Sequence, residues 1–307
     1  MEYIRKIIKV KGLNLREIMS QEINVRKMRL EDLLGVIRVC NQAFREAARI
    51  TSYIAPQLLE SLIKQPEAQL VAEVEGKIVG FLRGEFVFKE RKAIVAHIAV
   101  HPKYQGKGIG GKLIRHFEKL AKEKGLRKVS LGTPFARGFY EKLGYKCTKI
   151  TYAVVYDLVG KEVVMPKIEN FKVIDPITLD HITIIANSLT EKEVYNCLIH
   201  YFDLYKVPCK SSTLILDSNN KILGIVLGKE HTWIKDLLTV TYLYGSTLWI
   251  KTWLLKFMAY KASLLGLRYL GIRTDDNSLI KELLKEGWEI KSFDTFWTGY
   301  TMEKILT

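Results

Sequence analysis

The stretch HPKYQGKGIGGKLI, residues 101–114, decides the fold of this chain. Four glycines stand within six residues, 106–111, between the apolar run AIVAHIAV (93–100) and an amphipathic pattern that ends at Gly125. Glycine allows a ligand to approach the main chain closely. The unpaired N–H groups and the dipole at a helix start favour an anion. The stretch therefore predicts a strand, an anion-binding loop and a helix.

Two phosphate-loop patterns fit these letters incompletely. Residues 106–111 match GxGxxG, but a dinucleotide site also needs an acidic residue at the end of the next strand. That strand, 128–132, is followed by Thr133. Residues 106–112 match GxxxxGK, but Leu113 stands where a magnesium-binding Ser or Thr is required.

A third pattern, Q/R-x-x-G-x-G/A, is met by Gln105, Gly108 and Gly110. About thirty residues further on stands FYEKLGY, residues 139–145. Together the two motifs resemble the GNAT superfamily of acyl-CoA-dependent N-acyltransferases, over roughly residues 22–158. The resemblance implies an α/β fold of the α+β type: the GNAT fold, a mixed and mostly antiparallel sheet with flanking helices.

Hydrophobic periodicity gives an element order that agrees with this fold. We expect strands at 23–28, 93–100 and 128–132, helices at 30–44 and 58–64, and a hairpin over 68–88 that turns at 75–77.

The resemblance also implies a cofactor site. In the GNAT fold the strands 93–100 and 128–132 splay apart, and the pantetheine arm of coenzyme A fills the gap. We expect main-chain contacts from this gap to the acyl carbonyl and pantetheine, and main-chain N–H groups of the loop to bind the pyrophosphate. The side chains at the gap are expected to pack in the core. The residues are Ile98 and Val100 at the gap, and Gln105, Gly106, Lys107, Gly108, Ile109 and Gly110 in the loop.

Tyr140 matches the tyrosine that serves many members of the family as general acid to the coenzyme A sulfur. A thiol has a reference pKa near 8.5 and a lysine amine one near 10.4, so both proton movements of acyl transfer benefit from a positioned group. The alternative for Tyr140 is an aromatic ring packed on its helix.

The general base is open. Family members commonly carry a Glu on the strand that here is 93–100, whereas His97 is its only titratable residue. Strand alternation puts His97 opposite Ile98, so it faces substrate only if a bulge changes the phase. A structural histidine is the alternative, with Glu85 and Glu90 as further candidates for the base. Thr133 also departs from the Asn that relatives often carry, which affects a cofactor contact.

The chain contains a repeat. KIVGFLRG (77–84) matches KILGIVLG (221–228), KGLRKVSLGT (124–133) matches LGLRYLGIRT (265–274), and KLGYK (142–146) matches KEGWEI (285–290). The offsets of 144, 141 and 143 are nearly constant. We therefore expect an N-terminal extension (1–21) and two tandem domains of one architecture, a catalytic GNAT domain (22–159) and a degenerate GNAT-like domain (160–307).

The second copy lacks the chemical motifs. No glycine follows Gly245 in the stretch that corresponds to the loop, and Leu283 stands in place of Tyr140. This copy is expected to close the acceptor site or to mediate homodimer contacts through the aromatic run Tyr242–Trp253. Burial of that run in its own core is the alternative.

Charge and cysteine content narrow the partners. Residues 1–160 hold 30 Lys and Arg against 16 Asp and Glu, and residues 161–307 hold 18 against 17. A basic surface beside the glycine loop would attract the phosphates of coenzyme A. Nucleic acid is a secondary hypothesis, because no aromatic-interleaved basic motif accompanies the charge. The four cysteines form no CxxC pair, and no zinc framework or other metal site is visible.

The sequence thus predicts a cytoplasmic N-acetyltransferase without a membrane span. It moves an acetyl group from acetyl-CoA to an unidentified amine by direct attack in a ternary complex, because neither GxSxG nor a histidine near Cys147 indicates a covalent intermediate. The alternative is an acyl-CoA-binding regulatory or nucleic-acid-associated protein without turnover.

Overall fold

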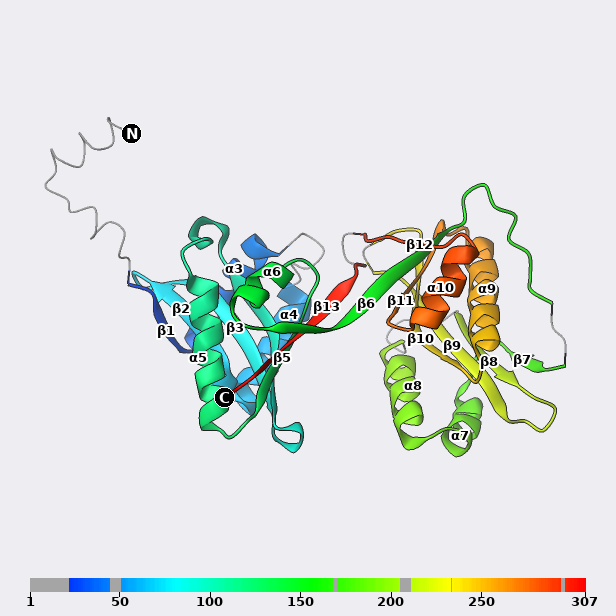
Figure 1. Ribbon diagram of the computed structural model, residues 1–307, viewed down its shortest axis with the longest axis horizontal. Helices are drawn as coiled ribbons and strands as arrows, with labels where there is room; N and C mark the ends of the chain where they lie inside the picture. Colours follow the sequence, from blue (N-terminus) through cyan, green and yellow to red (C-terminus); the bar gives the residue numbers. More distant parts are fainter. Residues whose placement is uncertain (1–21, 45–50, 168–169, 205–210, 233, 294–295) are drawn as a thin grey trace, which may run out of the picture. The chain divides into compact units, whose positions relative to one another are not determined.

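The chain forms two compact units. The computed structural model describes residues 22–307 except 45–50, 168–169, 205–210, 233 and 294–295 (Figure 1). The first unit contains the described residues up to Thr148 together with Tyr300–Thr307, and the second contains Lys149–Gly299. The expected N-terminal extension, 1–21, and Cys209 lie outside the described residues.

The first unit follows the expected order of elements. Its helices and strands are β1 (Asn24–Lys27), α3 (Leu33–Ala43), α4 (Thr51–Lys64), β2 (Gln69–Val74), β3 (Lys77–Val87), β4 (Lys92–Val100), α5 (Ile109–Glu123), β5 (Lys128–Thr133), α6 (Arg137–Lys142), the start of β6 (Lys146–Asp157) and β13 (Gly299–Ile305). Short 3-10 turns at Leu30–Asp32, Pro66–Ala68, Phe88–Glu90 and Pro102–Tyr104 join several of them.

The sheet of the first unit runs β1-β2-β3-β4-β5-β13. All neighbours are antiparallel except β4 and β5, so the predicted mixed, mostly antiparallel sheet is confirmed. Helix α5 packs on one face of the sheet (Figure 1). Its Leu113 and Phe117 are fully buried there. Helices α3 and α4 pack against Phe81 and Ala99 on the other face. The cleft described below therefore lies in a sheet covered on both sides.

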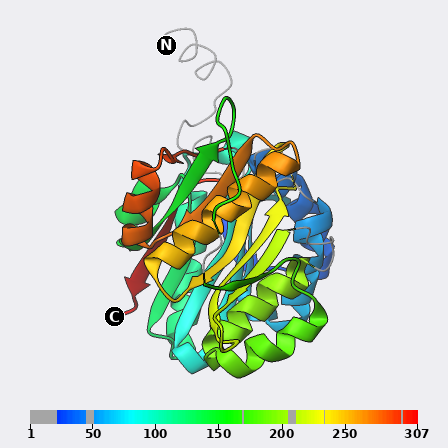
Figure 2. The same ribbon diagram turned by 90° about the vertical axis from the view of Figure 1, so that its right-hand side faces the viewer.

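The second unit repeats this arrangement. Its elements are β7 (Lys172–Ile174), α7 (Leu179–Ser188), α8 (Glu191–Leu204), β8 (Ser211–Leu216), β9 (Ile222–Glu230), β10 (Leu237–Gly245), α9 (Leu248–Leu264), β11 (Tyr269–Thr274), α10 (Asn277–Lys285) and β12 (Glu289–Ile290). The strand order is β7-β8-β9-β10-β11-β6, again with one parallel pair, β10 and β11. Figure 2 shows α9 crossing the strands of this unit.

The glycines of the repeat explain why the two sheets accept a helix so closely. A Cβ atom at Gly84 would lie 2.2 Å from the Phe117 ring of α5. At the matching Gly228 it would lie 2.4 Å from Met258 of α9. Only glycine allows a helix to approach a strand so closely. The shared K-I-x-G-x-x-x-G spacing therefore marks the place where α5 packs on the sheet of the first unit and α9 on that of the second.

Each sheet is completed by a strand from outside its own sequence repeat. Strand β13, the C-terminal strand, pairs with β5 from Tyr300–Thr133 to Ile305–Lys128. Most of β6, which follows α6 in the sequence, pairs with β11 of the second unit instead. The structural division therefore differs from the expected boundary at 159/160. The reason is that β13, from the second repeat, completes the sheet of the first unit, while most of β6, from the first repeat, completes the sheet of the second.

The aromatic run Tyr242–Trp253 is divided between core and surface: its last residues are buried in the second unit, residues 242–245 are half-buried, and residues 246–249 are exposed. Trp253 is 5% exposed and Ile250 is 4% exposed, while Trp249 is 57% exposed. Burial in the unit's own core, the alternative reading of this run, thus accounts for its C-terminal end and in part for Tyr242–Tyr244, but not for Trp249. Among the described residues, no helix combines the length and apolarity needed to cross a bilayer.

The exchange predicts that the first unit depends on β13. Met302 on this strand is fully buried, so Met302→Ala should lower the free energy of unfolding of the first unit by about 2–5 kcal/mol. Ile305→Ala, on the same strand but 65% exposed, is the matched control. All five tryptophans lie between 233 and 297. Circular dichroism should therefore report the shift while tryptophan fluorescence follows the second unit. Equal effects of the two substitutions would contradict this dependence.

Candidate functional site

The site begins where β4 and β5 part. Their parallel pairing covers only Lys92–Val95 of β4 and Lys128–Leu131 of β5. Strand β4 continues to Val100, paired on its other side with β3. The His101 N–H donates to the Val79 carbonyl at 2.8 Å. Because successive residues of a strand point their polar groups to opposite sides, those of Ile98 and Val100 point toward the gap. Such main-chain groups are available to a ligand that adds a strand.

The helix that follows the gap starts without a side-chain cap. The N-cap of α5 is Gly108, in the left-handed conformation at φ 81°, and Gly106 has φ 77°. A glycine N-cap offers no oxygen to the first-turn N–H groups, which remain open to an anion. Gln105 ties the loop to the strand, because its side-chain amide donates to the Val100 carbonyl at 2.9 Å. The loop is thus held against the gap. The Gln105 N–H donates to the Pro102 carbonyl at 3.2 Å, and the N–H groups of the first turn of α5 have no acceptor within the helix.

A cavity of about 570 Å³ joins the gap, the loop and α6. Eight residues expected at the site line it: Ile98, Val100, Gln105, Gly106, Gly108, Ile109, Gly110 and Tyr140. The residues that sequence reasoning did not select are Ala43, Ala99, Tyr104, Gly111, Ala136 and Phe139. Phe139 could have been predicted from the sequence, since it is the first residue of the FYEKLGY motif. In the structure its ring would lie 3.2 Å from a Cβ atom at Gly110.

Tyr140 lies at the inner wall of this cavity. It lies on α6 and is 5% exposed. Its ring packs edge to face against the rings of Phe139 and Tyr145, with centroid distances of 4.9 and 5.8 Å. Burial raises the pKa of its phenol to about 12. The hydroxyl therefore keeps its proton at neutral pH and can serve as a donor. Thr133, at the end of β5, accepts the Ala136 N–H at 3.0 Å and shapes the turn into α6.

Lys107 does not line the cavity, and its ammonium lies 5.2 Å from the centre of the Tyr104 ring. An arginine not singled out from the sequence, Arg115, lies with its guanidinium at the helix start. A Cβ atom added at Gly111 would lie 3.3 Å from the guanidinium of Arg115. The positive charge of Arg115 is therefore beside the first turn of α5. The i, i+4 spacing from Gly111 was the available signal.

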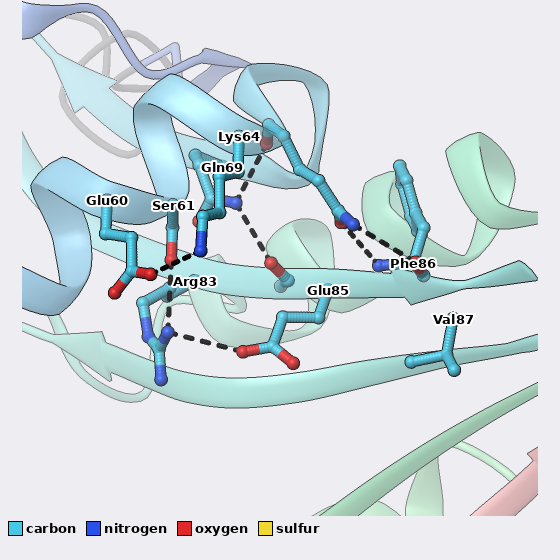
Figure 3. Close-up of a pocket in the computed structure, with 10 residues that line it drawn as sticks. Glu60, Ser61, Lys64, Gln69, Arg83, Glu85, Phe86 and Val87 are labelled. Atoms are coloured by element: carbon cyan, nitrogen blue, oxygen red, sulfur yellow. Dashed lines mark hydrogen bonds and ion pairs between the residues drawn. The ribbon is translucent and has the colours of Figure 1, made fainter.

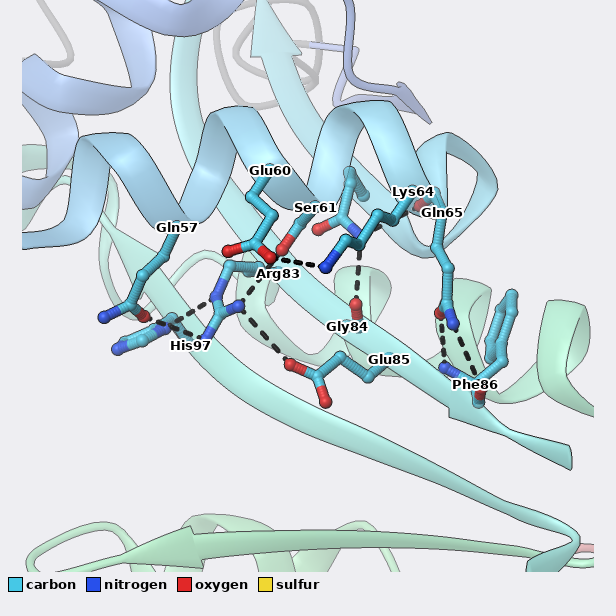
Figure 4. A network of polar contacts seen from close by, with 11 residues as sticks. Gln57, Glu60, Ser61, Lys64, Gln65, Arg83, Gly84, Glu85, Phe86 and His97 are labelled. Carbon is cyan, nitrogen blue, oxygen red and sulfur yellow. Dashed lines mark hydrogen bonds and ion pairs between the residues drawn. The ribbon is translucent and has the colours of Figure 1, made fainter. Parts of the chain in front are cut away.

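His97 lies outside the cavity lining, on the α4 face of the sheet. The register of β3 and β4 shifts between Arg83–His97 and Gly84–Val95, so Ala96 forms a bulge. The bulge changes the phase of the strand between Val95 and His97 but not between His97 and Ile98, so His97 remains on the face opposite Ile98, together with Ala99. Arg83 Nε donates to His97 Nδ1 at 3.0 Å (Figure 4). Burial, and then the charge of Arg83, lower the pKa of His97 to about 4.

The other candidates for the base differ in position. Glu85 lines a second hollow of about 280 Å³ between α4 and β3, together with Glu60, Ser61 and Lys64 (Figure 3). Its carboxylate lies 3.4 Å from Arg83. Glu90 is exposed and paired with Lys92 at 2.6 Å, in a 3-10 turn at the start of β4. The described residues contain no group of three or more His, Cys, Asp or Glu side chains arranged to hold a metal ion.

The second unit closes the corresponding site. Helix α9 is capped by Thr247, whose hydroxyl accepts the Ile250 N–H at 3.2 Å. Lys251 pairs with Asp276 at 2.7 Å beside the gap between β10 and β11, where the hollow is about 230 Å³. Leu283, the counterpart of Tyr140, is fully buried. The Thr247 hydroxyl thus binds a helix-start N–H group of the kind that an anion could bind in the first unit. Leu283, a core residue without a proton to donate, stands in place of Tyr140.

Comparisons with known proteins agree with this geometry. The model of the acetyltransferase (GNAT) family matches residues 34–145. A protein of Bacillus subtilis (strain 168), provisionally named ribosomal protein bS18-alanine N-acetyltransferase, is 33% identical over 132 residues, which cover 41% of this chain and 82% of that protein.

Two solved structures extend the likeness over both units. A tandem GNAT protein from the clavulanic acid biosynthesis pathway superposes with a TM-score of 0.67 at 14% identity, over 93% of this chain and 99% of that one. A GCN5-related N-acetyltransferase of Sphaerobacter thermophilus gives 0.63 at 14% identity, over 92% and 96%. At this identity the two structures support the fold alone.

The lowered pKa of His97 predicts a pH-dependent stability. A histidine in the unfolded chain has a pKa near 6.5, so below that pH His97 is protonated in the unfolded chain while it stays neutral in the folded protein. This contribution is complete above pH 6.5 and is lost as the pH falls toward 4, by about 1.4 kcal/mol per pH unit. The free energy of unfolding of wild type, measured with denaturant, should fall more steeply in this range than that of His97→Gln. Parallel curves would refute the pKa assignment.

Proposed function

Since this chain belongs to the GNAT acetyltransferase family, we propose that its first unit transfers an acetyl group from acetyl-CoA to an amine, by direct attack in a ternary complex. The observation that carries the proposal is one cavity shared by an uncapped helix start, an open strand edge and a buried tyrosine hydroxyl. These three features match the diphosphate, the pantetheine amides and the sulfur of one thioester carrier.

The main chain would bind the carrier. The N–H groups at the start of α5, over Gly108–Gly110, would hold the pyrophosphate, with Arg115 and Lys107 adding positive charge. The open edge at Ile98 and Val100 would pair with pantetheine as an added strand, although the Val100 carbonyl already accepts from Gln105. An N–H group of this edge would also stabilise the oxyanion that develops on the acetyl carbonyl.

Tyr140 would act on the leaving sulfur. With a pKa of about 12 it is a weaker acid than a thiol with a pKa near 8.5, so complete proton transfer to the thiolate is uphill. A hydrogen bond from the phenol that strengthens as negative charge develops on sulfur does not require that transfer. We therefore assign to Tyr140 the donation of this hydrogen bond to the sulfur as the tetrahedral intermediate collapses.

A protein or peptide N-terminus is the acceptor we propose. The Bacillus subtilis relative is named for acetylation of an alanine of a ribosomal protein. An α-amine has a pKa of about 7.7–8.0, so a sizeable fraction is neutral at pH 7, whereas a lysine amine with a pKa near 10.4 is almost entirely protonated. An α-amine therefore places a smaller demand on a base, which suits a site whose histidine has a pKa of about 4.

The second unit would be a non-catalytic copy. Its Thr247 cap and the Lys251–Asp276 pair occupy the region that the first unit leaves open, and Leu283 cannot donate to sulfur. We propose that it supports the first unit through the strand exchange, which supplies β13 to the sheet beside the site.

The release of coenzyme A in the presence of acetyl-CoA tests this function. We expect turnover with peptides that have a free N-terminal alanine. The same peptides blocked at the N-terminus and carrying a lysine are the matched control and should react at least tenfold more slowly. Binding of acetyl-CoA without turnover across both sets, and across polyamines and amino acids, would favour the non-catalytic alternative.

Tyr140→Phe tests the role of the hydroxyl. Loss of an acid catalyst should lower kcat by up to about 100-fold, because the thiolate loses its donor. The Kd of acetyl-CoA, measured by calorimetry, should change little. Tyr145→Phe is the matched control, since this neighbouring tyrosine is equally buried but does not line the cavity. An unchanged kcat in Tyr140→Phe would remove the residue from the mechanism.

A further inference from the structure

A buried arginine lies directly behind the site on the α4 face. Arg83 is 9% exposed, and its guanidinium donates from Nε to His97 Nδ1 at 3.0 Å. Its other nitrogens donate to Ser61 Oγ and Gln57 Oε1, both at 3.1 Å, and to the Glu85 carboxylate at 3.4 Å (Figure 4). Helix α4 and strand β3 thus hold the guanidinium in one orientation, with His97 as its partner on β4.

This contact determines the tautomer of His97. A guanidinium has only donors and stays charged at all accessible pH values, so Nδ1 of the ring must be the acceptor. The proton of the neutral imidazole is therefore on Nε2, on the side of the ring away from Arg83. The lone pair that a general base would need is already engaged.

The second unit shows that the fold does not require this pair. Its sheet has the same bulge, at Thr241, and the residues that face each other there are Leu227 and Tyr242. Leu227 is fully buried. A buried arginine is costly unless it is well paired, whereas leucine fills the same position in the sister unit without that cost. The Arg83–His97 pair in the first unit therefore points to function.

The described residues provide no acceptor for the Nε2–H, and its position indicates what it binds. His97 shares its face of β4 with Ala99, which lines the cofactor cavity two residues, or about 7 Å, further along the strand. Helix α4 covers this face, so the N–H lies on the side of the sheet opposite α5. An attacking amine must keep its lone pair for the acetyl carbon, so the donor suits an oxygen close to that amine.

We propose that Arg83 is a positioning residue that fixes His97 as a neutral donor, whose Nε2–H binds a carbonyl oxygen next to the reacting amine. This inference rests on the proposed function and specifies it: the acceptor is an α-amino acyl group, such as a peptide N-terminus, and not a simple amine. Within the part of the chain that the structure describes, the other charged groups that line the hollow beside Arg83 are Glu60 and Lys64 on α4 and Glu85 on β3.

Nitrogen NMR of the histidine side chains tests the tautomer without any turnover. The His97 signals, identified by their loss in His97→Gln, should show the Nε2–H tautomer and remain neutral down to about pH 5 in the full-length protein. Arg83→Met should release Nδ1, so that both tautomers appear and the pKa of the ring rises from its wild-type value, while burial still holds it below the ordinary 6.5. Arg38→Met, at an exposed arginine on α3, is the matched control and should leave the His97 signals unchanged. An Nδ1–H tautomer in wild type would overturn the proposal.

Kinetics test the donor itself. The glutamine amide can replace an Nε2–H donor but cannot act as a base, so His97→Gln should restore most of the kcat/KM that His97→Leu loses. For His97→Leu we expect roughly a tenfold loss, the effect of removing one hydrogen bond. The loss should appear with an amino acid amide and should be absent with an amine of matched pKa that lacks the carbonyl.

Equal damage from His97→Gln and His97→Leu, or the same loss with both amines, would overturn the donor role. Failure of the proposed function would look different. Wild type would then release no coenzyme A with any amine, while the NMR experiment would still decide whether Arg83 sets the tautomer.

Discussion

The parting of β4 from β5 is the constraint on which the site depends. Pairing stops after Val95 and Leu131, next to the bulge at Ala96, and from there each strand follows its other neighbour. A parallel pair that separates leaves polar groups without partners in the middle of a covered sheet, and these must be satisfied by a ligand or by solvent. The glycine loop at the end of β4 extends the same unpaired surface to the start of α5. One break in pairing thus creates both halves of the cleft that Ile98, Val100 and the loop line.

The two units show how the same scaffold is opened or closed. Both have the bulge, the parallel pair and the glycines that seat the crossing helix. In the second unit a threonine hydroxyl caps the helix start, and an ion pair lies beside the gap. In the first unit glycine leaves the same donors free. The difference between a site and a structural copy therefore lies in a few side chains, while the backbone is common to both.

The predictable part of the structure is the part encoded by local signals. Local sequence signals predict the loop after 93–100, the helix that follows it, and the position of Tyr140. These signals are the spacing of the glycines, the helical period of the apolar residues and the FYEKLGY motif. The exchange of β6 and β13 is not, because the two strands have the same topology and each could complete either sheet. The Arg83–His97 contact depends on strand register and on a bulge, neither of which has a signature in one sequence. Lys107 shows the opposite case, a residue inside the motif whose side chain turns to Tyr104.

The strand exchange also bears on why the chain keeps a second unit that lacks the chemical groups. Strand β13 pairs with β5, and the far side of β5 borders the cleft. Lys304 of β13 bonds Glu118 of α5 at 2.8 Å, and Glu303 bonds Lys128 of β5 at 3.0 Å. The C-terminal strand thus braces both the strand and the helix that frame the site. Loss of the second copy would remove the sequence that carries the chain from β6 to β13. Under the proposed function, selection on the first unit alone is then sufficient to retain the second.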